Sequence, residues 1–212
     1  MTWDLLRDVP EEDVTRLLST ARRRRFAKGE VVFHEGDPAT TFHLIDRGRV
    51  AVRVTTPVGE VVTLDVLKAG QVVGELALLS SGGERTASVL ALEPVQTRSI
   101  SSTAFAALRR DHPSVDEVLV QLLAARVCRL NERLLEALYV PADRRVRRRL
   151  LDLAELYAGA VPLTQEDIAG LAGTTRATVN RVLRGDEKEG IVSLERARLT
   201  VLDASTLARK AR

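Results

Sequence analysis

The hydrophobic pattern of the chain changes its period near residue 113, and this change restricts the possible folds most strongly. Between Phe26 and Ile100, short apolar runs are separated by glycine-containing turns. The clearest runs occupy residues 31–33, 42–45, 50–54 and 61–67. Many short strands at nearly regular spacing are typical of a small antiparallel barrel or jelly roll. After Pro113 the apolar residues recur at helical spacing, so the sequence predicts an α+β chain.

A short segment precedes the expected barrel. Residues 11–25 contain apolar residues at helical spacing and run into four consecutive arginines, Arg22 to Arg25. We expect a short helix there. The arginines then form a solvated approach to the first strand, or else an interaction patch.

The helical region contains a regular apolar seam. Its members step by 3, 4, 3, 4 and 3 residues and are Val120, Leu123, Val127, Leu130, Leu134 and Ala137. A heptad seam of this length favours a two-chain coiled coil over a helix that packs only on its own barrel. Pro141 then predicts a hinge at residues 138–143. We therefore divide the chain into a barrel domain (1–112), a dimerisation helix (113–138) and a C-terminal domain (139–212).

The C-terminal part carries the basic excess of the chain. Residues 1–140 contain 18 Lys and Arg against 19 Asp and Glu, whereas residues 141–212 contain 14 against 10. This asymmetry suggests a polyanionic partner for the C-terminal part.

Residues 163–183 have the pattern of two short helices joined by a tight turn. Thr164 with Asp167 resembles a capping pair, Gly173 supplies the turn, and Thr174 or Thr175 can cap the second helix. A helix-turn-helix places such a second helix in the major groove of double-stranded DNA. The candidate contacts are Thr164, Thr174, Thr175, Arg176, Ala177, Thr178, Asn180 and Arg181. An ordinary helical hairpin with scattered arginines is the alternative.

Two short strands are expected after the second helix, at residues 191–194 and 198–202. They would form the wing of a winged helix. Arg196 and Arg198 would then contact the DNA backbone.

The run from Gly74 to Ser88 places Glu75 and Arg85 ten positions apart between glycines. Recognition of a negatively charged cyclic ester requires a guanidinium for the phosphate, free backbone N–H groups and an acceptor for a sugar hydroxyl. The run contains all of these groups. It is therefore a candidate ligand site in the barrel.

These features in this order resemble the Crp/Fnr family of bacterial transcription regulators over essentially the whole chain. The resemblance implies a cyclic-nucleotide-binding jelly-roll barrel, a long dimerisation helix and a winged helix-turn-helix. It also implies that Glu75 accepts the ribose 2′-hydroxyl and Arg85 pairs with the cyclic phosphate. Thr86 and the backbone at Gly74 and Leu76 would complete the phosphate cradle. The alternative is a barrel turn closed by a Glu75–Arg85 ion pair, with no ligand.

The chain departs from the family pattern at three places. Leu130 and Asn131 stand where cyclic AMP responders commonly offer a threonine followed by Ser or Asn to the adenine, and Leu130 cannot hydrogen-bond to it. Ala177 replaces a glutamate of the second helix, so we expect altered or relaxed base specificity. Gly185 and Asp186 replace residues of a helix that usually continues with apolar side chains. We expect this helix to end early or this position to be more exposed.

Cysteine and histidine usage argues against metal or disulfide chemistry. Cys128 is the only cysteine, which excludes an intramolecular disulfide and a cysteine-held iron–sulfur cluster within one chain. We expect Cys128 to be a small buried residue beside the seam. The three histidines, His34, His43 and His112, lack metal-ligand spacing, so we expect no metal.

The sequence as a whole predicts a homodimeric, sequence-specific transcription regulator that is not an enzyme. The expected ligand is an allosteric cyclic nucleotide, cyclic AMP, and the expected partners are a near-palindromic DNA operator and RNA polymerase. No apolar run is long enough for a membrane span, so we expect a cytoplasmic protein. An effector-independent regulator of the same fold is the alternative, and a cupin-type metal enzyme is less favoured.

Overall fold

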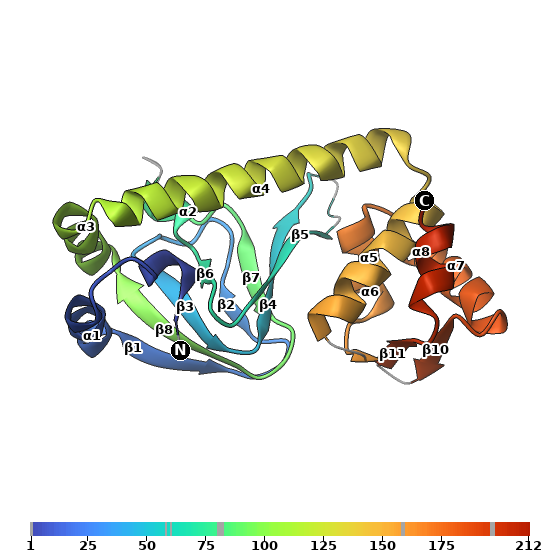
Figure 1. Cartoon of the computed structure of the whole chain (residues 1–212), viewed down its shortest axis with the longest axis horizontal. Helices are drawn as coiled ribbons and strands as arrows, with labels where there is room; N and C mark the ends of the chain where they lie inside the picture. Colours follow the sequence, from blue (N-terminus) through green and yellow to red (C-terminus); the bar gives the residue numbers. More distant parts are fainter. Residues whose placement is uncertain (1, 58, 60, 80–82, 158–159, 196–197) are drawn as a thin grey trace. The chain divides into compact units, whose positions relative to one another are not determined.

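The computed structural model describes residues 2–57, 59, 61–79, 83–157, 160–195 and 198–212. The chain divides into two compact units, one with residues 1–59 and 64–127 and the other with residues 60–63 and 128–212. The division falls within one helix, α4 (Ser114–Tyr139), which Figure 1 shows as uninterrupted. The segment that the sequence assigns to dimerisation therefore contributes residues to both units.

The first unit contains the predicted jelly roll. One four-stranded sheet has the order β1 (Arg22–Phe26), β8 (Val95–Ser101), β3 (Thr41–Arg47) and β6 (Val72–Val73). The other has the order β2 (Val31–Phe33), β7 (Ser88–Ala91), β4 (Arg49–Thr55) and β5 (Val61–Lys68), of which residues 61–63 are grouped with the second unit. Strand neighbours that are far apart in sequence, such as β1 with β8, pair antiparallel. The strands expected at 31–33, 42–45, 50–54 and 61–67 are all present.

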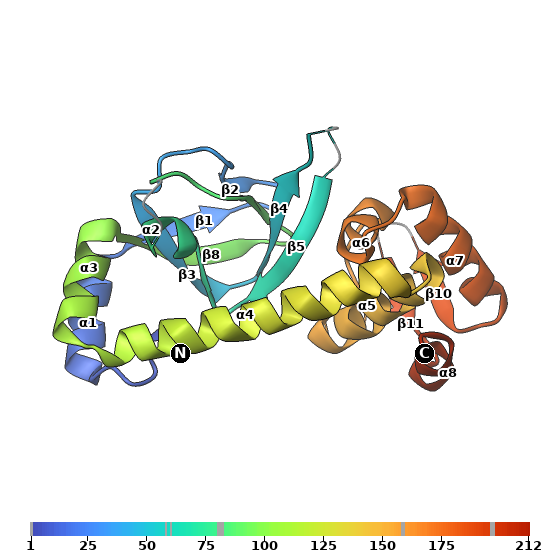
Figure 2. The same cartoon turned by 90° about the horizontal axis from the view of Figure 1, so that it is seen from above.

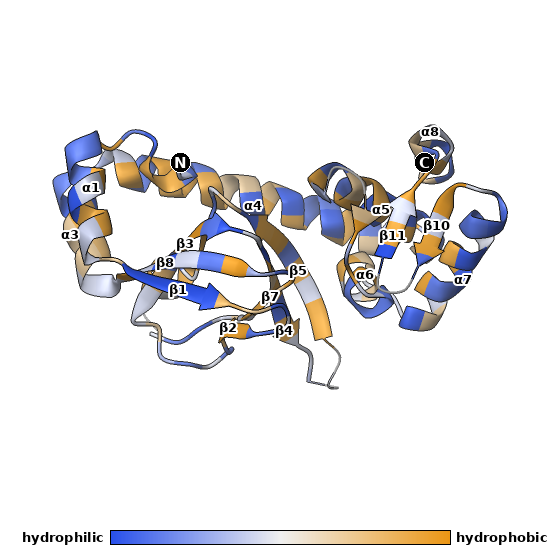
Figure 3. Ribbon diagram, turned by 90° about the horizontal axis from the view of Figure 1, so that it is seen from below, coloured by the Kyte–Doolittle hydropathy of each residue, from blue (hydrophilic) through white to orange (hydrophobic). Residues whose placement is uncertain are grey.

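The four arginines before the barrel are part of a strand. Helix α1 (Glu11–Thr20) ends before them, and β1 begins at Arg22. Its residues pair with β8 in a register that places Arg22 opposite Ser99 and Phe26 opposite Val95. The arginine side chains are exposed, and Figure 3 shows β1 as hydrophilic along most of its length. Charged side chains on an edge strand disfavour pairing with another chain, so the arginines are compatible with this position.

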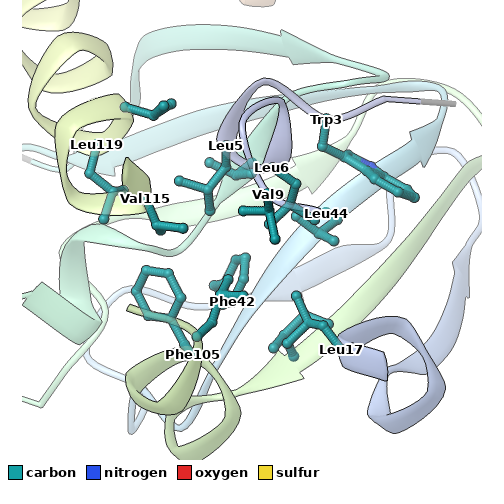
Figure 4. Packing of buried hydrophobic residues seen from close by; sticks show 14 residues of the cluster. Trp3, Leu5, Leu6, Val9, Leu17, Phe42, Leu44, Phe105, Val115 and Leu119 are labelled. Atoms are coloured by element: carbon teal, nitrogen blue, oxygen red, sulfur yellow. The ribbon is translucent and has the colours of Figure 1, made fainter. Parts of the chain in front are cut away.

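Two apolar clusters stabilise the first unit. One lies between the two sheets, where Phe26 and Ile45 from one sheet meet Val50 and Val89 from the other. The second lies outside the β1–β8–β3–β6 sheet, where α1, α3 (Ser102–Asp111) and the start of α4 cover it (Figure 4). The rings of Phe42 and Phe105 pack there at a tilt of 48°, with centroids 4.7 Å apart.

Helix α4 uses a different set of side chains for its own barrel than for the heptad seam. Its buried residues are Val115, Val118 and Leu119. The seam is largely exposed in the single chain, with exposed fractions of 65% at Val120 and 55% at Val127. The prediction that Cys128 is buried is wrong for the single chain: the residue is exposed, because the seam beside which it lies is itself largely exposed.

The second unit is a helical bundle with a small sheet. It contains α5 (Ala142–Tyr157), α6 (Gln165–Ala172), α7 (Arg176–Lys188) and α8 (Ala204–Lys210). The antiparallel sheet has the order β10 (Val192–Glu195), β11 (Arg198–Val201) and β9 (Ala160–Val161). Figure 2 shows α6 and α7 side by side. Helix α4 ends at Tyr139 and α5 begins after Pro141, as the proline predicts. The sequence did not predict β9 or α8.

No helix among the described residues is both long and apolar enough to cross a membrane. The same residues contain no group of three or more His, Cys, Asp or Glu side chains that could hold a metal ion.

Candidate functional site

Gly74 allows a close approach between the backbone and a guanidinium. It follows β6 and has a φ of +89°, a conformation that favours glycine. A Cβ at this position would lie 2.6 Å from Nη1 of Arg85. With glycine in place, Nη1 of Arg85 donates a 3.0 Å hydrogen bond to the Gly74 carbonyl.

Arg85 is a buried cation with incomplete hydrogen bonding. The residue is 5% exposed, its guanidinium lies 4.0 Å from the centroid of the Phe33 ring, and Nη2 donates to Thr41 Oγ1 at 3.2 Å. Its Nε is buried and has no hydrogen-bond partner among the described residues. Burial lowers the pKa of Arg85, while the charges of Asp37 and Glu75 act in the opposite direction. The side chain therefore offers a free donor in a site that favours an anion.

Glu75 pairs with a residue of α4. The carboxylate is buried, and Nη1 of Arg126 donates to its Oε1 at 3.0 Å. The sequence left open an ion pair between Glu75 and Arg85. In the structure the ion-pair partner of Glu75 is Arg126. The sequence analysis did not identify Arg126 as a site residue. Its signal is its position one turn before Leu130, on the same face of the helix.

A small cavity of about 40 Å³ collects most of the predicted ligand residues. Its lining includes Gly74, Glu75, Leu76, Arg85 and Thr86, together with Arg126 and the apolar side chains of Phe33, Val52, Val73, Ala87 and Val89. Small-molecule pockets commonly have volumes of about 300–1,000 Å³. A nucleotide therefore requires movement in this site, and Arg126 is the lining residue supplied by α4.

The other two predicted ligand residues lie further along α4. Leu130 and Asn131 are both exposed in the single chain. Arg126 is the described α4 residue that lines the cavity. Residues 80–82 of the glycine-containing run lie outside the described residues.

The helix-turn-helix is built as its capping residues predict. Thr164 and Asp167 form a capping box at the start of α6, and Gly173 ends this helix in a left-handed conformation. Thr175, rather than Thr174, caps α7 by accepting a hydrogen bond from the backbone of Thr178. The threonines at 164 and 175 thus fix the two helices, and their contacts with DNA remain predictions.

The start of α7 presents a polar outer face. Arg176, Ala177, Asn180 and Arg181 are exposed, and Thr178 is half-buried. The inward face carries Val179, Val182 and Leu183, all of which are buried. Asn180 Nδ2 donates to Gln165 Oε1 of α6 at 3.1 Å. Arg176 and Arg181, the two arginines of α7 predicted to contact DNA, are therefore exposed to solvent on one helix.

A hollow lies between the starts of α6 and α7 and the wing. Its volume is about 560 Å³, and its lining includes Thr164, Arg176 and Arg198. The structure thus brings three predicted DNA-contacting residues around one surface depression. Glu166 and Glu195 also line it. Arg196 lies outside the described residues.

Most arginines of α5 are used within the second unit. Arg148 and Arg149 donate to the two oxygens of Glu136 at 2.9 and 2.7 Å, and Arg149 also pairs with Asp152 at 2.9 Å. Desolvation raises the pKa of Asp152, opposed by the positive charge of Arg149. The excess of basic residues in 141–212 therefore does not measure the charge of a DNA-binding surface, because many of these arginines pair with acidic side chains of the same unit.

Arg145 joins the C-terminal ends of two helices. Its guanidinium donates to the carbonyls of Ala137 and Val140 at the end of α4, at 3.3 and 2.8 Å. It also donates to those of Ala172 and Gly173 at the end of α6, at 2.9 and 2.8 Å. The last carbonyls of a helix lack partners within that helix, and five donors in a fixed fork suit two such ends at once.

Neither sequence prediction for Gly185 and Asp186 is correct. Helix α7 continues through both residues to Lys188, and Asp186 is completely buried. The carboxylate is paired with Arg147 of α5 and Lys210 of α8. Burial alone would lower the pKa of Arg147, but hydrogen bonds and charge from Asp186, and then from Asp143, raise it. Tertiary ion pairs thus offset the cost of a charge at an apolar position.

Comparison with known proteins supports both halves of this architecture. Residues 23–112 match the cyclic nucleotide-binding domain family, and residues 144–210 match the Crp-like helix-turn-helix domain. The cyclic AMP receptor protein of Thermus thermophilus is 34% identical over 206 residues, which cover 96% of this chain and 94% of that protein. The chain belongs to the Crp-like transcription regulators. Members of this family are regulators and not enzymes.

Other relatives agree with this assignment. The CRP-like cAMP-activated global transcriptional regulator of Mycobacterium tuberculosis is 32% identical over 195 residues, covering 88% of this chain and 87% of that protein. The c-di-GMP responsive global regulator CLP of Xanthomonas campestris superposes with a TM-score of 0.81 at 20% identity, covering 91% of this chain and 99% of that one. The latter likeness shows the shared fold.

Proposed function

We propose that this Crp-like regulator is a cytoplasmic homodimer that binds a cyclic nucleotide, cyclic AMP in the first instance, and thereby controls its binding to DNA. The observation that carries the ligand proposal is Arg85, a buried guanidinium beside Gly74 and Glu75 whose Nε has no hydrogen-bond partner among the residues that the structure describes. A cyclic phosphate would accept from that donor and neutralise the buried charge. The names of the Thermus and Mycobacterium relatives, both of which refer to cyclic AMP, support this choice.

Admission of the ligand requires a change at Arg126. The cavity of about 40 Å³ is too small for a nucleotide while Arg126 pairs with Glu75. A ribose hydroxyl that hydrogen-bonds to Glu75 would compete with this pair. Ligand binding would then alter a contact made by α4. It would shift the equilibrium between two positions of this helix to the extent that the ligand binds one of them more tightly than the other.

The exposed seam of α4 supports the homodimer. It alternates Val120, Leu123, Val127 and Leu130 at heptad spacing, and β-branched residues alternating with leucine favour two parallel strands. A second copy of α4 would cover these apolar side chains. Asn131 would be available to the nucleotide base, whereas Leu130 would contribute to the seam.

The dimer would place two α7 helices in successive major grooves of a near-palindromic operator. The half-sites would be about one helical turn, or roughly 34 Å, apart. Arg176 and Arg181 would bind guanine edges, and Thr164, Thr174, Thr175, Thr178 and Asn180 would contact bases or phosphates, as would Arg196 and Arg198 from the wing. Ala177 cannot accept a hydrogen bond from cytosine, so base choice there would be relaxed. RNA polymerase is the further partner expected of such a regulator.

A constitutive regulator is the second candidate, and two observations favour it. Arg126 and Glu75, which both line the cavity, already pair with each other, and Leu130 extends the apolar seam without a ligand. In that case the dimer would bind its operator whether or not a nucleotide is present.

Calorimetry on nucleotide-free protein distinguishes the two candidates. We expect heat of binding with cyclic AMP or cyclic GMP and none with linear 5′-AMP, which lacks the cyclic ester. Selection of bound DNA from a random pool, with and without cyclic AMP, would supply the operator. Operator binding without any nucleotide heat would exclude the allosteric proposal in favour of the constitutive one.

The DNA contacts can be tested on one helix. We expect Arg181→Ala to cost about 1–3 kcal/mol of operator affinity and to relax selection at one base pair. Arg184→Ala is the matched control, because Arg184 is exposed on the same helix and pairs with Glu187 at 2.8 Å. A uniform loss on all DNA sequences would make Arg181 a phosphate contact.

A further inference from the structure

The apolar inward face of α7 ends in a carboxylate. Val179, Val182 and Leu183 are buried, and the next inward position, one turn later, is Asp186. Apolar contacts, which have no preferred direction, hold the first part of the helix. A buried carboxylate is held by directional hydrogen bonds, so this end of α7 is subject to a different kind of restraint.

Arg147 binds Asp186 in two-point geometry. Its Nε lies 2.9 Å from Oδ2, and its Nη2 lies 3.0 Å from Oδ1. A bidentate guanidinium–carboxylate pair fixes an angle as well as a distance. Arg147 is itself held by Asp143, with Nη1 3.2 Å from Oδ2. The C-terminal turn of α7 therefore has a defined orientation on α5.

A second cation connects Asp186 to α8. Nζ of Lys210 lies 3.3 Å from Oδ1 of Asp186 and 2.6 Å from Oε1 of Glu189. Arg148 of α5 binds the carbonyl of Ala211, just after α8, at 2.9 Å. Three helices that are distant in sequence thus share one charged cluster.

Helix α5 is in turn attached to the end of α4. Arg145 binds the last carbonyls of α4, and Arg148 and Arg149 bind Glu136. An orientation set at the α4–α5 junction therefore has a continuous path of directional contacts to α7. The path runs from Glu136 to α5, and through Arg147 to Asp186.

We propose that Asp186 is a positioning residue for DNA recognition, which sets the orientation of α7 on α5 through its bidentate pair with Arg147. Its role is distinct from that of the base-contacting residues, because it lies on the buried face of the helix. It acts on specific binding through the geometry of α7. The proposal rests on DNA binding by α7 and is independent of the nature of the barrel ligand.

The sign of one substitution separates positioning from simple electrostatics. Asp186→Asn removes a negative charge, which by itself would strengthen binding to all DNA sequences. We expect the opposite for the operator: a loss of affinity on the order of tenfold, comparable to the loss of one base-pair contact, while affinity for non-specific DNA does not fall. Glu187→Gln is the matched control, because it removes the same charge from the next, partly exposed position.

A double substitution separates positioning from fold stability. Replacing a buried ion pair by apolar residues of similar volume is often neutral or stabilising. We therefore expect the Arg147→Met/Asp186→Leu protein to unfold near the wild-type temperature in thermal melts followed by circular dichroism. Its operator binding tests the positioning role even if Asp186→Asn folds poorly. Weak operator binding by this stable protein supports the proposal. Full operator affinity in the double variant, or Asp186→Asn binding as tightly as Glu187→Gln, would overturn it.

Discussion

The stability of the barrel should depend on pH through His43. This residue lies on β3 and is 6% exposed, and its Nδ1 lies 3.0 Å from Thr97 Oγ1. Desolvation by burial, followed by the positive charges of Arg85 and Arg24, lowers the pKa of His43 from 6.5 to about 4. As the pH falls, His43 of the unfolded chain therefore takes up a proton near pH 6.5, whereas His43 of the folded barrel takes one up only near pH 4. The stability that neutral His43 contributes is present above pH 6.5 and is lost as the pH falls from 6.5 toward 4.

The size of this effect follows from the two pKa values. From pH 7 to pH 5 the loss is about 2 kcal/mol, and the full difference corresponds to about 3 kcal/mol. Trp3 is the only tryptophan, is buried in the same unit and donates from Nε1 to the Ile45 carbonyl at 3.2 Å. Its fluorescence in urea titrations should report barrel unfolding at each pH.

Two substitutions test the assignment to His43: a neutral replacement of His43 itself, and the same replacement of another histidine, His112, as the control. His43→Gln should remove most of the loss between pH 7 and pH 5, whereas His112→Gln should retain it. His112 lies 3.1 Å from Asp13 and is therefore in a different electrostatic setting. An equal loss of stability in wild type and His43→Gln would refute the assignment to His43.

Two further substitutions test the ligand site and the helix junction. Gly74→Ala should abolish cyclic AMP binding in calorimetry, because its Cβ would displace Arg85, while Gly70→Ala carries similar backbone strain without the clash and should bind normally. Arg145→Lys should lower the unfolding free energy of the second unit by about 1–3 kcal/mol in guanidinium titrations, since lysine cannot satisfy the ends of α4 and α6 together. Arg144→Lys, which loses one exposed bond to a backbone carbonyl, should change little. Equal cyclic AMP binding by Gly74→Ala and Gly70→Ala would contradict the clash with Arg85. Equal unfolding free energies of Arg145→Lys and Arg144→Lys would contradict the role of Arg145 at the two helix ends.

Local patterns were sufficient to predict the helix-turn-helix. The pair Thr164 and Asp167, the turn at Gly173 and the cap at Thr175 are contained within a few residues each, and their hydrogen bonds are local. The barrel strands were predictable for the same reason, because glycine turns and apolar runs alternate along the sequence. The start of β1 was not, since its arginines have no apolar alternation and depend on pairing with β8.

Long-range partners account for what the sequence could not show about the sites. Arg126 binds Glu75 across 51 positions of sequence, so its place in the cavity depends on how α4 lies on the barrel. Arg147 and Asp186 are 39 positions apart, and each alone suggests an exposed charge or a broken helix.

The sequence by itself determined the order of barrel, long helix and helix-turn-helix, the turns and caps, the helix break at Pro141 and the grouping of Gly74, Glu75, Arg85 and Thr86 in one run. These features arise from backbone preferences and hydrogen bonds between near neighbours. Only the tertiary structure decided which charges are paired, because an arginine in a sequence does not specify its carboxylate. It assigned Arg126 to Glu75 and Arg147 to Asp186, and it turned much of the basic C-terminal excess into internal bonds.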